Sequence, residues 1–423
     1  MLNNYCQNNI LHNQLNENQI YSNNFLFFPQ QQNIFQNINY TNNIYNIINF
    51  PCISIPQERK KTENPKNKKL LEVNKSNKKC SFNTTIKRKN NYDQIDLYEI
   101  KEFENYLNNL PFPLIDYLRT QKGAKEVYKN IIKSPQECKT ILINKLRKNL
   151  SLLMIDIYGN YFCQDIIKSS NQNQIILILK YIKDDYVNIA KNYSGTHVLQ
   201  TICDMITSQE EENIILNSIN DKELEMAYDS NATYVLQKII TIINECRRSK
   251  LNNIILDNFK NLSLDVNGIC LVKKFIGNNI LNHIRNKIIN IINENCIQIS
   301  QSPFGNYVVQ FILENWGINQ CISIVKTIIN NICVLSTQKF SSNVSEKLIE
   351  YLDEKNLYLL IHELFYTNKV MNILKNKYGR YVLLKAVKAL NKNQREELSI
   401  YLSNINISNN KDRNKLKNFI NNF

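Results

Sequence analysis

A short motif recurs along the chain at a nearly constant spacing, and this periodicity restricts the fold more than any other feature. Its clearest copy is SPFGNYVVQFILE, Ser302 to Glu314. Related copies occur about every 36 residues in both directions, a period typical of helical repeats. Their alignment positions are Gly123, Gly159, Gly195, Ala232, Gly268, Gly305, Ser341 and Gly379, which are separated by 36, 36, 37, 36, 37, 36 and 38 residues.

The segments between these copies carry the apolar periodicity of helices. Examples are Ile175 to Ile182, Ile214 to Ile219 and Ile322 to Ile329. A single unit of this size cannot bury its apolar face alone, whereas stacked units share one continuous core. The sequence therefore predicts an all-α solenoid of eight repeats with flanking cap helices.

Three of the copies, GNYFCQ, GNYVVQ and SSNVSEK, resemble the repeats of the Pumilio (PUF) family of RNA-binding proteins. The resemblance extends from about Leu110 to Leu402. It implies a right-handed crescent in which the second helix of each repeat lines the concave face and presents three side chains to one RNA base. Polar side chains at i and i+4 lie on one face of a helix and can bond a base edge, while a planar side chain at i+1 can stack on the base.

The resemblance assigns to each repeat a first edge residue, a stacking residue and a second edge residue. The predicted RNA-binding residues are Lys125 in repeat 1, Asn160, Tyr161 and Gln164 in repeat 2, Thr196, His197 and Gln200 in repeat 3, Thr233, Tyr234 and Gln237 in repeat 4, Lys273 in repeat 5, Asn306, Tyr307 and Gln310 in repeat 6, Ser342, Asn343 and Glu346 in repeat 7, and Arg380 and Tyr381 in repeat 8.

By the same resemblance, Asn with Gln recognises uracil, Ser with Glu recognises guanine, and a small residue with Gln usually recognises adenine. Family members bind RNA antiparallel, so the last repeat meets the 5′ base. The predicted site is therefore N-G-U-N-A-A-U-N, which overlaps a UGU core. The chemistry agrees, because a carboxylate accepts hydrogen bonds from guanine N1–H and N2–H₂.

Three repeats depart from the family pattern. Repeat 8 carries Arg380 and Leu384 where the family usually has Asn and Gln, repeat 5 offers Ile269 and Cys270 without a stacking plane, and Lys125 replaces a planar residue in repeat 1. The sequence therefore does not predict which bases are recognised at positions 1, 4 and 8.

Composition divides the chain into four segments. Residues 1–57 are rich in Asn and Gln, contain no Lys or Arg, and are predicted to be a disordered low-complexity segment. Residues 58–90 form a basic linker, in which 12 Lys and Arg against 3 Glu give +9 of the net charge of +15. Residues 91–405 hold the repeats and caps, the latter including DLYEIKEFENYLNNL and a helix from Asn393 to Leu402. Residues 406–423 are predicted to be a polar C-terminal tail.

The basic balance favours a polyanionic partner. The 11 Cys include no CxxC pair, and Cys163, Cys203 and Cys270 lie among apolar neighbours. We therefore expect these cysteines to be reduced thiols that pack in the core as small residues. Four scattered His make a metal site improbable, and no cofactor is expected. Without a membrane-length apolar stretch or a signal-peptide pattern, the sequence predicts a soluble, cytoplasmic protein that is a monomer.

No nucleophile with a His partner, paired-carboxylate cluster or Gly-rich phosphate loop indicates an enzyme. The resemblance implies a protein that binds single-stranded RNA in mRNA 3′ untranslated regions. It would repress translation or promote decay through partners on its convex face. Two alternatives stay open: a protein-binding scaffold of the armadillo or HEAT type, and a nucleolar PUF-like factor of ribosome biogenesis, whose relatives usually have degenerate base-recognition residues.

Overall fold

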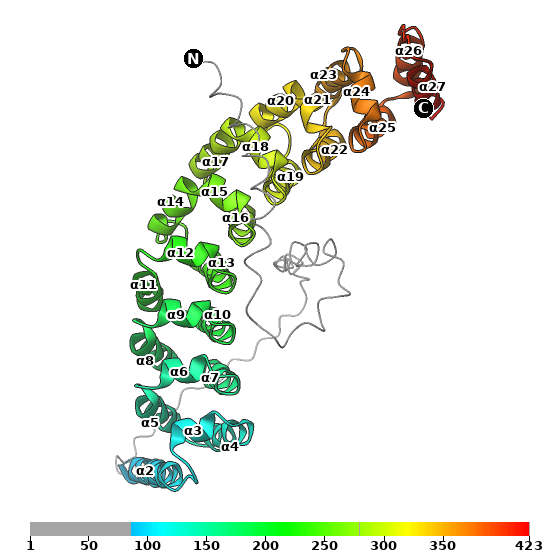
Figure 1. Ribbon diagram of the computed structural model, residues 1–423. Coiled ribbons are helices and arrows are strands. Elements are labelled where there is room, and N and C mark those ends of the chain that lie inside the picture. The colour runs from blue at the N-terminus through cyan, green and yellow to red at the C-terminus, as the bar shows by residue number, and fades with distance from the viewer. Residues whose placement is uncertain (1–85, 279, 423) are drawn as a thin grey trace, which may run out of the picture. The chain divides into compact units, whose positions relative to one another are not determined.

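The computed structural model describes residues 86–278 and 280–422, so the predictions for residues 1–57 and for most of the basic linker lie outside the described residues. The described residues are helical with no strand among them, as the sequence predicts. Figure 1 shows that most of the helices form three rows, called here the inner, middle and outer rows.

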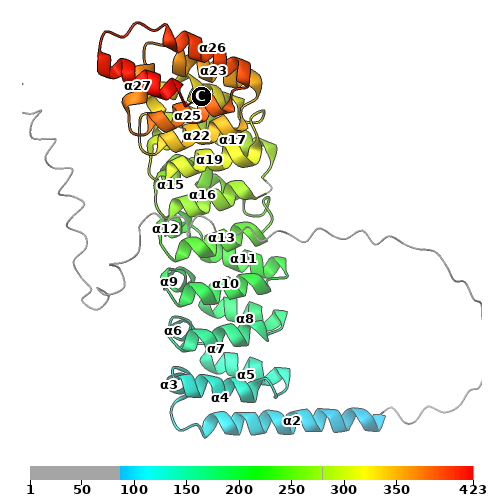
Figure 2. The same cartoon turned by 90° about the vertical axis from the view of Figure 1, so that its right-hand side faces the viewer.

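The inner row holds the helices that carry the recurring motif. They are α4 (Gln121–Ile131), α7 (Gly159–Lys168), α10 (Gly195–Met205), α13 (Ala232–Ile242), α16 (Gly268–Gly277), α19 (Gly305–Trp316), α22 (Ser341–Tyr351) and α25 (Gly379–Ala389). Each inner helix packs on the next along the chain. Figure 2 looks onto this row, whose helices lie like the rungs of a ladder, and Figure 1 shows that it follows the concave side of the stack.

The middle row consists of short helices that each precede an inner helix: α3 (Leu114–Leu118), α6 (Leu150–Met154), α9 (Tyr186–Lys191), α12 (Glu223–Tyr228), α15 (Phe259–Leu264), α18 (Cys296–Gln301), α21 (Ile332–Leu335) and α24 (Val370–Lys375). The outer row consists of α5 (Gln136–Leu146), α8 (Gln172–Ile182), α11 (Gln209–Ser218), α14 (Ser249–Asp257), α17 (Asn282–Glu294), α20 (Ile322–Asn330), α23 (Glu354–Phe365) and α26 (Lys392–Ser403).

The core runs between the rows without interruption. In α10 the buried apolar residues are Val198, Leu199, Ile202 and Cys203, which lie three, four, seven and eight positions after the first residue of the helix. The same positions are buried in α13 and α19. Because each such side chain contributes about 1.5–3 kcal/mol when fully buried, the repeated pattern stabilises every junction of the stack in the same way.

The recurring glycine allows five of the inner helices, α7, α10, α16, α19 and α25, to begin close against the preceding short helix. A Cβ atom on Gly305 would lie 2.5 Å from the backbone oxygen of Ile299 in α18. Repeat 7 has Ser341 at this position, and its hydroxyl donates a hydrogen bond of 2.7 Å to the corresponding carbonyl oxygen, that of Leu335. The close approach is thus kept where the glycine is replaced.

Additional helices pack at the two ends of the stack. Helix α2 (Ile86–Asn108) packs on α5 and buries Phe103 and Leu107, in agreement with the predicted N-terminal cap. Residues 406–423 were expected to be a polar tail, but Asn410–Ile420 form α27, which packs on α24 and α26. Its Phe419 ring lies 6.3 Å from that of Phe365, between ring centroids. Buried Leu416 and Phe419, together with the ion pair of 2.5 Å between Lys375 of α24 and Asp412, hold this helix in place.

The described cysteines are free thiols. Cys163 and Cys203 are buried, and burial raises the pKa of both, that of Cys203 to about 12. Such thiols are poor nucleophiles at neutral pH and act as small apolar residues. Within residues 86–422, no helix has the length and apolar character needed to cross a bilayer.

Candidate nucleic-acid interface

The predicted RNA-binding residues lie at the beginning of the inner helices. In α7 the first edge residue, Asn160, is the second residue of the helix, Tyr161 is the third and Gln164 the sixth. The other helices that begin at the recurring position follow the same register. Since neighbouring inner helices pack on each other, the structure brings the triplets of successive repeats together along the inner row.

The members of a triplet differ sharply in exposure. Asn160 is 4% exposed, whereas Tyr161 is 66% exposed and Gln164 lies between these extremes. The first edge residues of repeats 3, 4, 6 and 7 are buried as well, namely Thr196, Thr233, Asn306 and Ser342. The predicted stacking residues Tyr161, His197, Tyr234, Asn343 and Tyr381 are exposed, and Tyr307 is half-buried. A base can therefore reach the stacking residue and the second edge residue more easily than the first.

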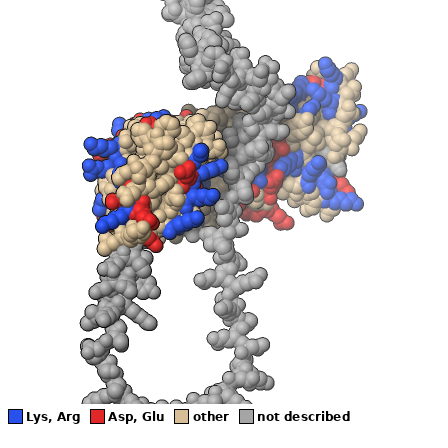
Figure 3. Space-filling model, turned by 90° about the horizontal axis from the view of Figure 1, so that it is seen from below, with Lys and Arg blue, Asp and Glu red and all other residues tan. Residues whose placement is uncertain are grey.

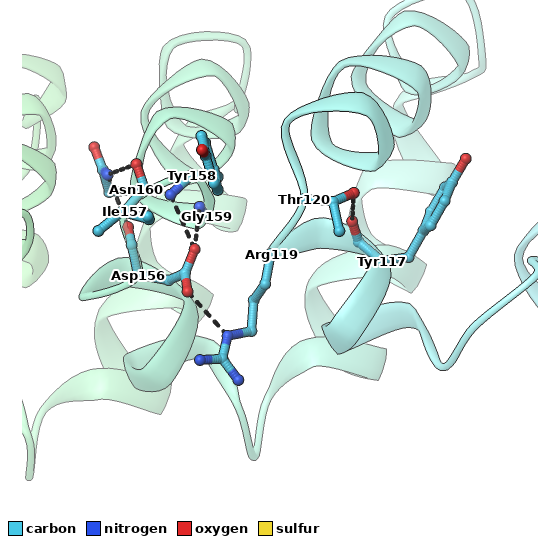
Figure 4. Close-up of polar contacts among 8 residues, drawn as sticks. All are labelled: Tyr117, Arg119, Thr120, Asp156, Ile157, Tyr158, Gly159 and Asn160. Atoms are coloured by element: carbon cyan, nitrogen blue, oxygen red, sulfur yellow. Dashed lines mark hydrogen bonds and ion pairs between the residues drawn. The ribbon is translucent and has the colours of Figure 1, made fainter.

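Hydrogen bonds explain why Asn160 is buried. Its Nδ2 donates to the backbone oxygens of Asp156 at 2.8 Å and Ile157 at 3.0 Å, contacts visible in Figure 4. Its Oδ1 accepts a hydrogen bond of 3.1 Å from Gln164 Nε2. Gln164 Oε1 in turn lies 3.4 Å from the Thr201 hydroxyl of α10. Asn160 thus uses both its donors on the backbone and orients the glutamine.

Helix α19 repeats this arrangement. Asn306 Nδ2 donates to the backbone oxygens of Ser302 at 2.8 Å and Pro303 at 3.0 Å, and Gln310 Nε2 donates to Asn306 Oδ1 at 2.9 Å. With one Nε2 hydrogen held by the asparagine, the glutamine has a second N–H and a carbonyl oxygen for a ligand. One donor and one acceptor side by side match the edge of uracil.

A polar residue three positions before the recurring glycine fixes the start of the helix. Asp156 Oδ1 accepts hydrogen bonds of 2.9 Å from the backbone N–H groups of Tyr158 and Gly159, and its Oδ2 accepts one of 2.9 Å from Arg119 Nε (Figure 4). Burial opposes ionisation of Asp156, but the hydrogen bonds from Gly159, Arg119 and Tyr158 outweigh it and lower the pKa of this carboxyl.

This capping residue is not among the residues predicted from the sequence to bind RNA. Its signal is nevertheless present, since residues that favour helix N-caps occupy the same position in other repeats. Equivalent hydrogen bonds from backbone N–H groups are accepted by the side-chain oxygens of Asn192, Asp229, Asp265, Ser302 and Asn376.

Repeats 3 and 4 have the same edge residues but different bonding. Thr196 Oγ1 donates to the backbone oxygen of Asn231 at 3.0 Å and accepts from Gln200 Nε2 at 3.3 Å. In repeat 4, Thr233 Oγ1 and Gln237 Nε2 are shielded from water and have no hydrogen-bond partner. An unpaired buried polar group costs about 1–3 kcal/mol. A ligand that pairs with these two atoms would therefore gain more binding free energy at repeat 4 than at repeat 3.

Repeat 7 presents a carboxylate instead of an amide. Ser342 Oγ donates to the backbone oxygen of Lys339 at 3.3 Å, and Glu346 is half-buried on the next turn. Burial raises the pKa of Glu346, Lys385 lowers it and Glu350 raises it, with a net increase. Lys385 Nζ bonds Glu350 Oε1 at 2.5 Å, so its charge is shared with another acid. In these contacts no group donates a hydrogen bond to the Glu346 carboxylate, so its oxygens can accept from a base.

The three repeats that depart from the family pattern also differ in structure. In repeat 8 the Arg380 guanidinium carbon lies 4.7 Å from the centroid of the Tyr381 ring, and Nη2 donates to the Tyr381 hydroxyl at 2.8 Å. Arg380 therefore covers one face of the predicted stacking residue. In repeat 5 Ile269 is buried and Lys273 Nζ lies 5.5 Å from the Phe311 ring of α19. In repeat 1 Lys125 is exposed.

Three ion pairs join neighbouring helices of the inner row. The pairs are Lys238 with Asp204 at 2.5 Å, Lys347 with Glu314 at 3.6 Å, and Lys385 with Glu350 at 2.5 Å. The end of the molecule seen in Figure 3 likewise shows basic and acidic side chains interspersed. Such pairing leaves less free positive charge for phosphates, so contacts to bases carry more of the expected recognition.

Comparison with known proteins agrees with this geometry. The Pumilio-family RNA binding repeat matches residues 149–182, 185–219, 224–245, 295–329 and 331–365. These spans hold α7, α10, α13, α19 and α22, the helices of repeats 2, 3, 4, 6 and 7. These five repeats are also the ones whose recognised base the sequence predicts.

Several characterised proteins are similar over the same region. Pumilio domain-containing protein C6G9.14 of Schizosaccharomyces pombe is 26% identical over 285 residues, which are 67% of this chain and 42% of that protein. Pumilio homolog 12 of Arabidopsis thaliana is 26% identical over 254 residues, 59% of this chain and 42% of that protein. The chain thus spans about two fifths of the length of these relatives.

Solved structures show the same fold. The Puf4 RNA binding domain bound to the HO endonuclease RNA 3′ UTR recognition sequence gives a TM-score of 0.62 at 22% identity, covering 71% of this chain and 97% of that one. The RNA-binding domain of yeast Puf5p bound to AAT2 RNA gives 0.61 at 20% identity, covering 75% and 100%. From the matching repeats, the relatives and the shared solenoid, the chain belongs to the Pumilio (PUF) family of RNA-binding proteins.

Proposed function

We propose that this protein binds single-stranded RNA sequence-specifically and recognises UGU-containing elements of the form N-G-U-N-A-A-U-N. The observation that carries the proposal is that the two edge residues of a repeat are hydrogen-bonded to each other at the same positions of α7, α10 and α19. Asn160 with Gln164 and Asn306 with Gln310 hold the same geometry, as the second and sixth residues of α7 and α19. A uracil N3–H would donate to the glutamine Oε1, and a uracil carbonyl would accept from the free N–H.

Repeat 7 would recognise the guanine of the UGU core. The Glu346 carboxylate offers two acceptor oxygens to guanine N1–H and N2–H₂, while uracil would present an acceptor oxygen to the same group. Burial of Glu346 strengthens this discrimination, because an unpaired charge costs more where water is excluded. Asn343 is the exposed residue that would lie against the base.

We further propose that the RNA targets are mRNA 3′ untranslated regions and that the protein represses translation or promotes decay in the cytoplasm. Support comes from the similar Puf4 domain, whose bound RNA is a 3′ UTR recognition sequence. Repressor or deadenylation factors would bind the convex face of a monomer. Family membership disfavours a protein-binding armadillo or HEAT scaffold, and the intact triplets of repeats 6 and 7 disfavour a nucleolar factor with degenerate recognition.

Selection of bound RNA from a random pool by the full chain tests this function. The expected consensus contains G-U at positions 2 and 3 and U at position 7, with adenine favoured at positions 5 and 6. A pool without enrichment, or a consensus unrelated to UGU, would contradict the proposal.

Replacing Tyr307 by Ala is expected to weaken binding to the predicted RNA by about 1–3 kcal/mol, the usual loss for one stacked base. Tyr307 follows Asn306 on α19, where its ring can lie against the base that Gln310 bonds. The measurement is the dissociation constant at one salt concentration. Tyr358→Ala on the outer helix α23 is the matched control, because Tyr358 is 67% exposed and lies outside the inner row. Equal affinities of the two variants would argue against RNA on the inner row.

Guanine preference is expected to decline as the pH falls from about 7 to about 5, earlier than for an ordinary glutamate. The pKa of Glu346 is raised in the free protein, chiefly by burial, and donors from guanine would lower it in the complex. Binding therefore favours the ionised form and weakens as protonation begins. Affinities for UGU and UUU RNAs across this range measure the effect. The variant Glu346→Gln should show no such decline, and an identical pH profile of both proteins would exclude Glu346 as its source.

A further inference from the structure

Repeat 3 contains an exposed aromatic residue that the three-residue pattern does not include. Tyr193 lies two positions before Gly195, in the turn between α9 and α10, and is 76% exposed. Its ring centroid lies 5.7 Å from that of His197, the predicted stacking residue of the same repeat, and the two ring planes are at 90°. The pair thus forms an aromatic corner at the start of an inner helix.

This placement differs from that of the equivalent residues in other repeats. The position two before the recurring residue is Ile157 in repeat 2, Ser230 in repeat 4, Val266 in repeat 5 and Pro303 in repeat 6. None of these four residues has an aromatic ring. The stacking residue of repeat 3 is also smaller than in most other repeats, because His197 has an imidazole ring where repeats 2, 4, 6 and 8 have the phenol ring of a tyrosine.

An aromatic corner suits a nucleobase. A base that lies flat on one of two perpendicular rings meets the other ring with its edge, and both stacked and edge-to-face contacts between aromatic rings are favourable. A purine has a larger face and a longer edge than a pyrimidine, so it gains more from both contacts. Among the edge residues of repeat 3, Thr196 is bonded to both Asn231 and Gln200, so Gln200 is the one that can also bond the base edge.

We propose that Tyr193 is an RNA-contacting residue that, with His197, favours a purine at position 6 of the bound RNA. This inference rests on the proposed function and assigns a fourth contact to repeat 3. Tyr193 would hold the base of that nucleotide from its edge while the His197 ring stacks on it. The exposed phenol ring is otherwise a large apolar surface with one ring neighbour.

The test compares dissociation constants of the full chain and its Tyr193→Ala variant for three RNAs that differ only at position 6: adenine, uracil and an abasic nucleotide. The variant is expected to bind the adenine RNA about 5- to 20-fold more weakly and the abasic RNA equally well. The adenine-over-uracil preference of the full chain should shrink in the variant. Tyr193→Phe should bind like the original protein, because the corner needs the ring and not the hydroxyl.

Two controls separate this inference from the proposed function. Tyr358→Ala removes a similarly exposed ring from α23 and should leave all affinities unchanged. Tyr307→Ala tests the inner row itself. If Tyr307→Ala weakens binding and Tyr193→Ala does not, or if Tyr193→Ala weakens the abasic RNA as much as the adenine RNA, the fourth contact is wrong while the function stands. If neither Tyr307→Ala nor Tyr193→Ala weakens binding to the adenine RNA, the proposed function fails and the inference with it.

Discussion

The double variant Ser342→Asn with Glu346→Gln is expected to prefer an RNA with UUU at its 5′ core over one with UGU, the reverse of the original protein. In the proposed complex Glu346 would face two N–H donors of guanine, and an unmet bond to a charged group costs on the order of 1–3 kcal/mol or more. The original protein should therefore prefer UGU by roughly tenfold to a few hundredfold. The double variant replaces this carboxylate by an amide that matches uracil.

The backbone of α22 is already arranged for the new side chains. The buried Ser342 donates its hydroxyl to the Lys339 oxygen, and its backbone N–H donates to the Gln338 oxygen. These are the carbonyls three and four positions earlier, the same two that Asn306 bonds in α19. An asparagine introduced at position 342 can thus bond the backbone and orient the new glutamine as in repeat 6.

Affinities of both proteins for both RNAs at one salt concentration, with thermal unfolding curves, measure the exchange. Glu346→Gln removes a half-buried carboxyl whose pKa is raised by burial, a group that costs stability once it is ionised at neutral pH, so the unfolding temperature should not fall from this change. The reciprocal variant Asn306→Ser with Gln310→Glu should gain guanine preference at position 3. A double variant that still prefers guanine, or an original protein that binds both RNAs equally, would refute the assignment of one base to repeat 7.

The sequence alone predicts where the inner helices begin. Gly159, Gly195, Ala232, Gly268, Gly305, Ser341 and Gly379 are the first residues of their helices, because small residues are needed where each inner helix meets the preceding short helix. Repeat 1 differs, since α4 begins at Gln121 and not at Gly123. The apolar positions that follow these residues are likewise the ones that the structure buries.

Other features depend on spatial neighbours that no periodicity encodes. Helix α27 buries only Leu416 and Phe419, so its segment has the composition of a tail until α24 is beside it. The burial of Asn160 and Asn306 is set by carbonyls of the preceding turn, which a pattern of polar residues at i and i+4 does not reveal. The stacking of Arg380 on Tyr381 depends on a side-chain conformation that its sequence position leaves free.

Replacing Gly305 by Ala is expected to lower the free energy of unfolding by about 1–3 kcal/mol, the usual cost of overpacking. The new methyl group would lie 2.5 Å from the Ile299 backbone oxygen and 3.0 Å from its Cγ2 atom, and Ile299 is fully buried in α18. Neither atom can move away as a flexible side chain would. Alanine is favoured over glycine in helices by about 1 kcal/mol, so a net loss of stability requires the steric cost to exceed this gain.

Gly277→Ala provides the matched control for this substitution. A methyl group there would meet only the Phe311 side chain, at 3.4 Å, which is ordinary van der Waals contact. The control should be as stable as the original protein or slightly more stable, because it gains helix propensity without a clash. Urea unfolding followed by circular dichroism at 222 nm compares the midpoints of the three proteins. A Gly305→Ala midpoint at or above that of Gly277→Ala would show that α18 and α19 can separate without cost, and the close approach would then not explain why glycine recurs at the start of the inner helices.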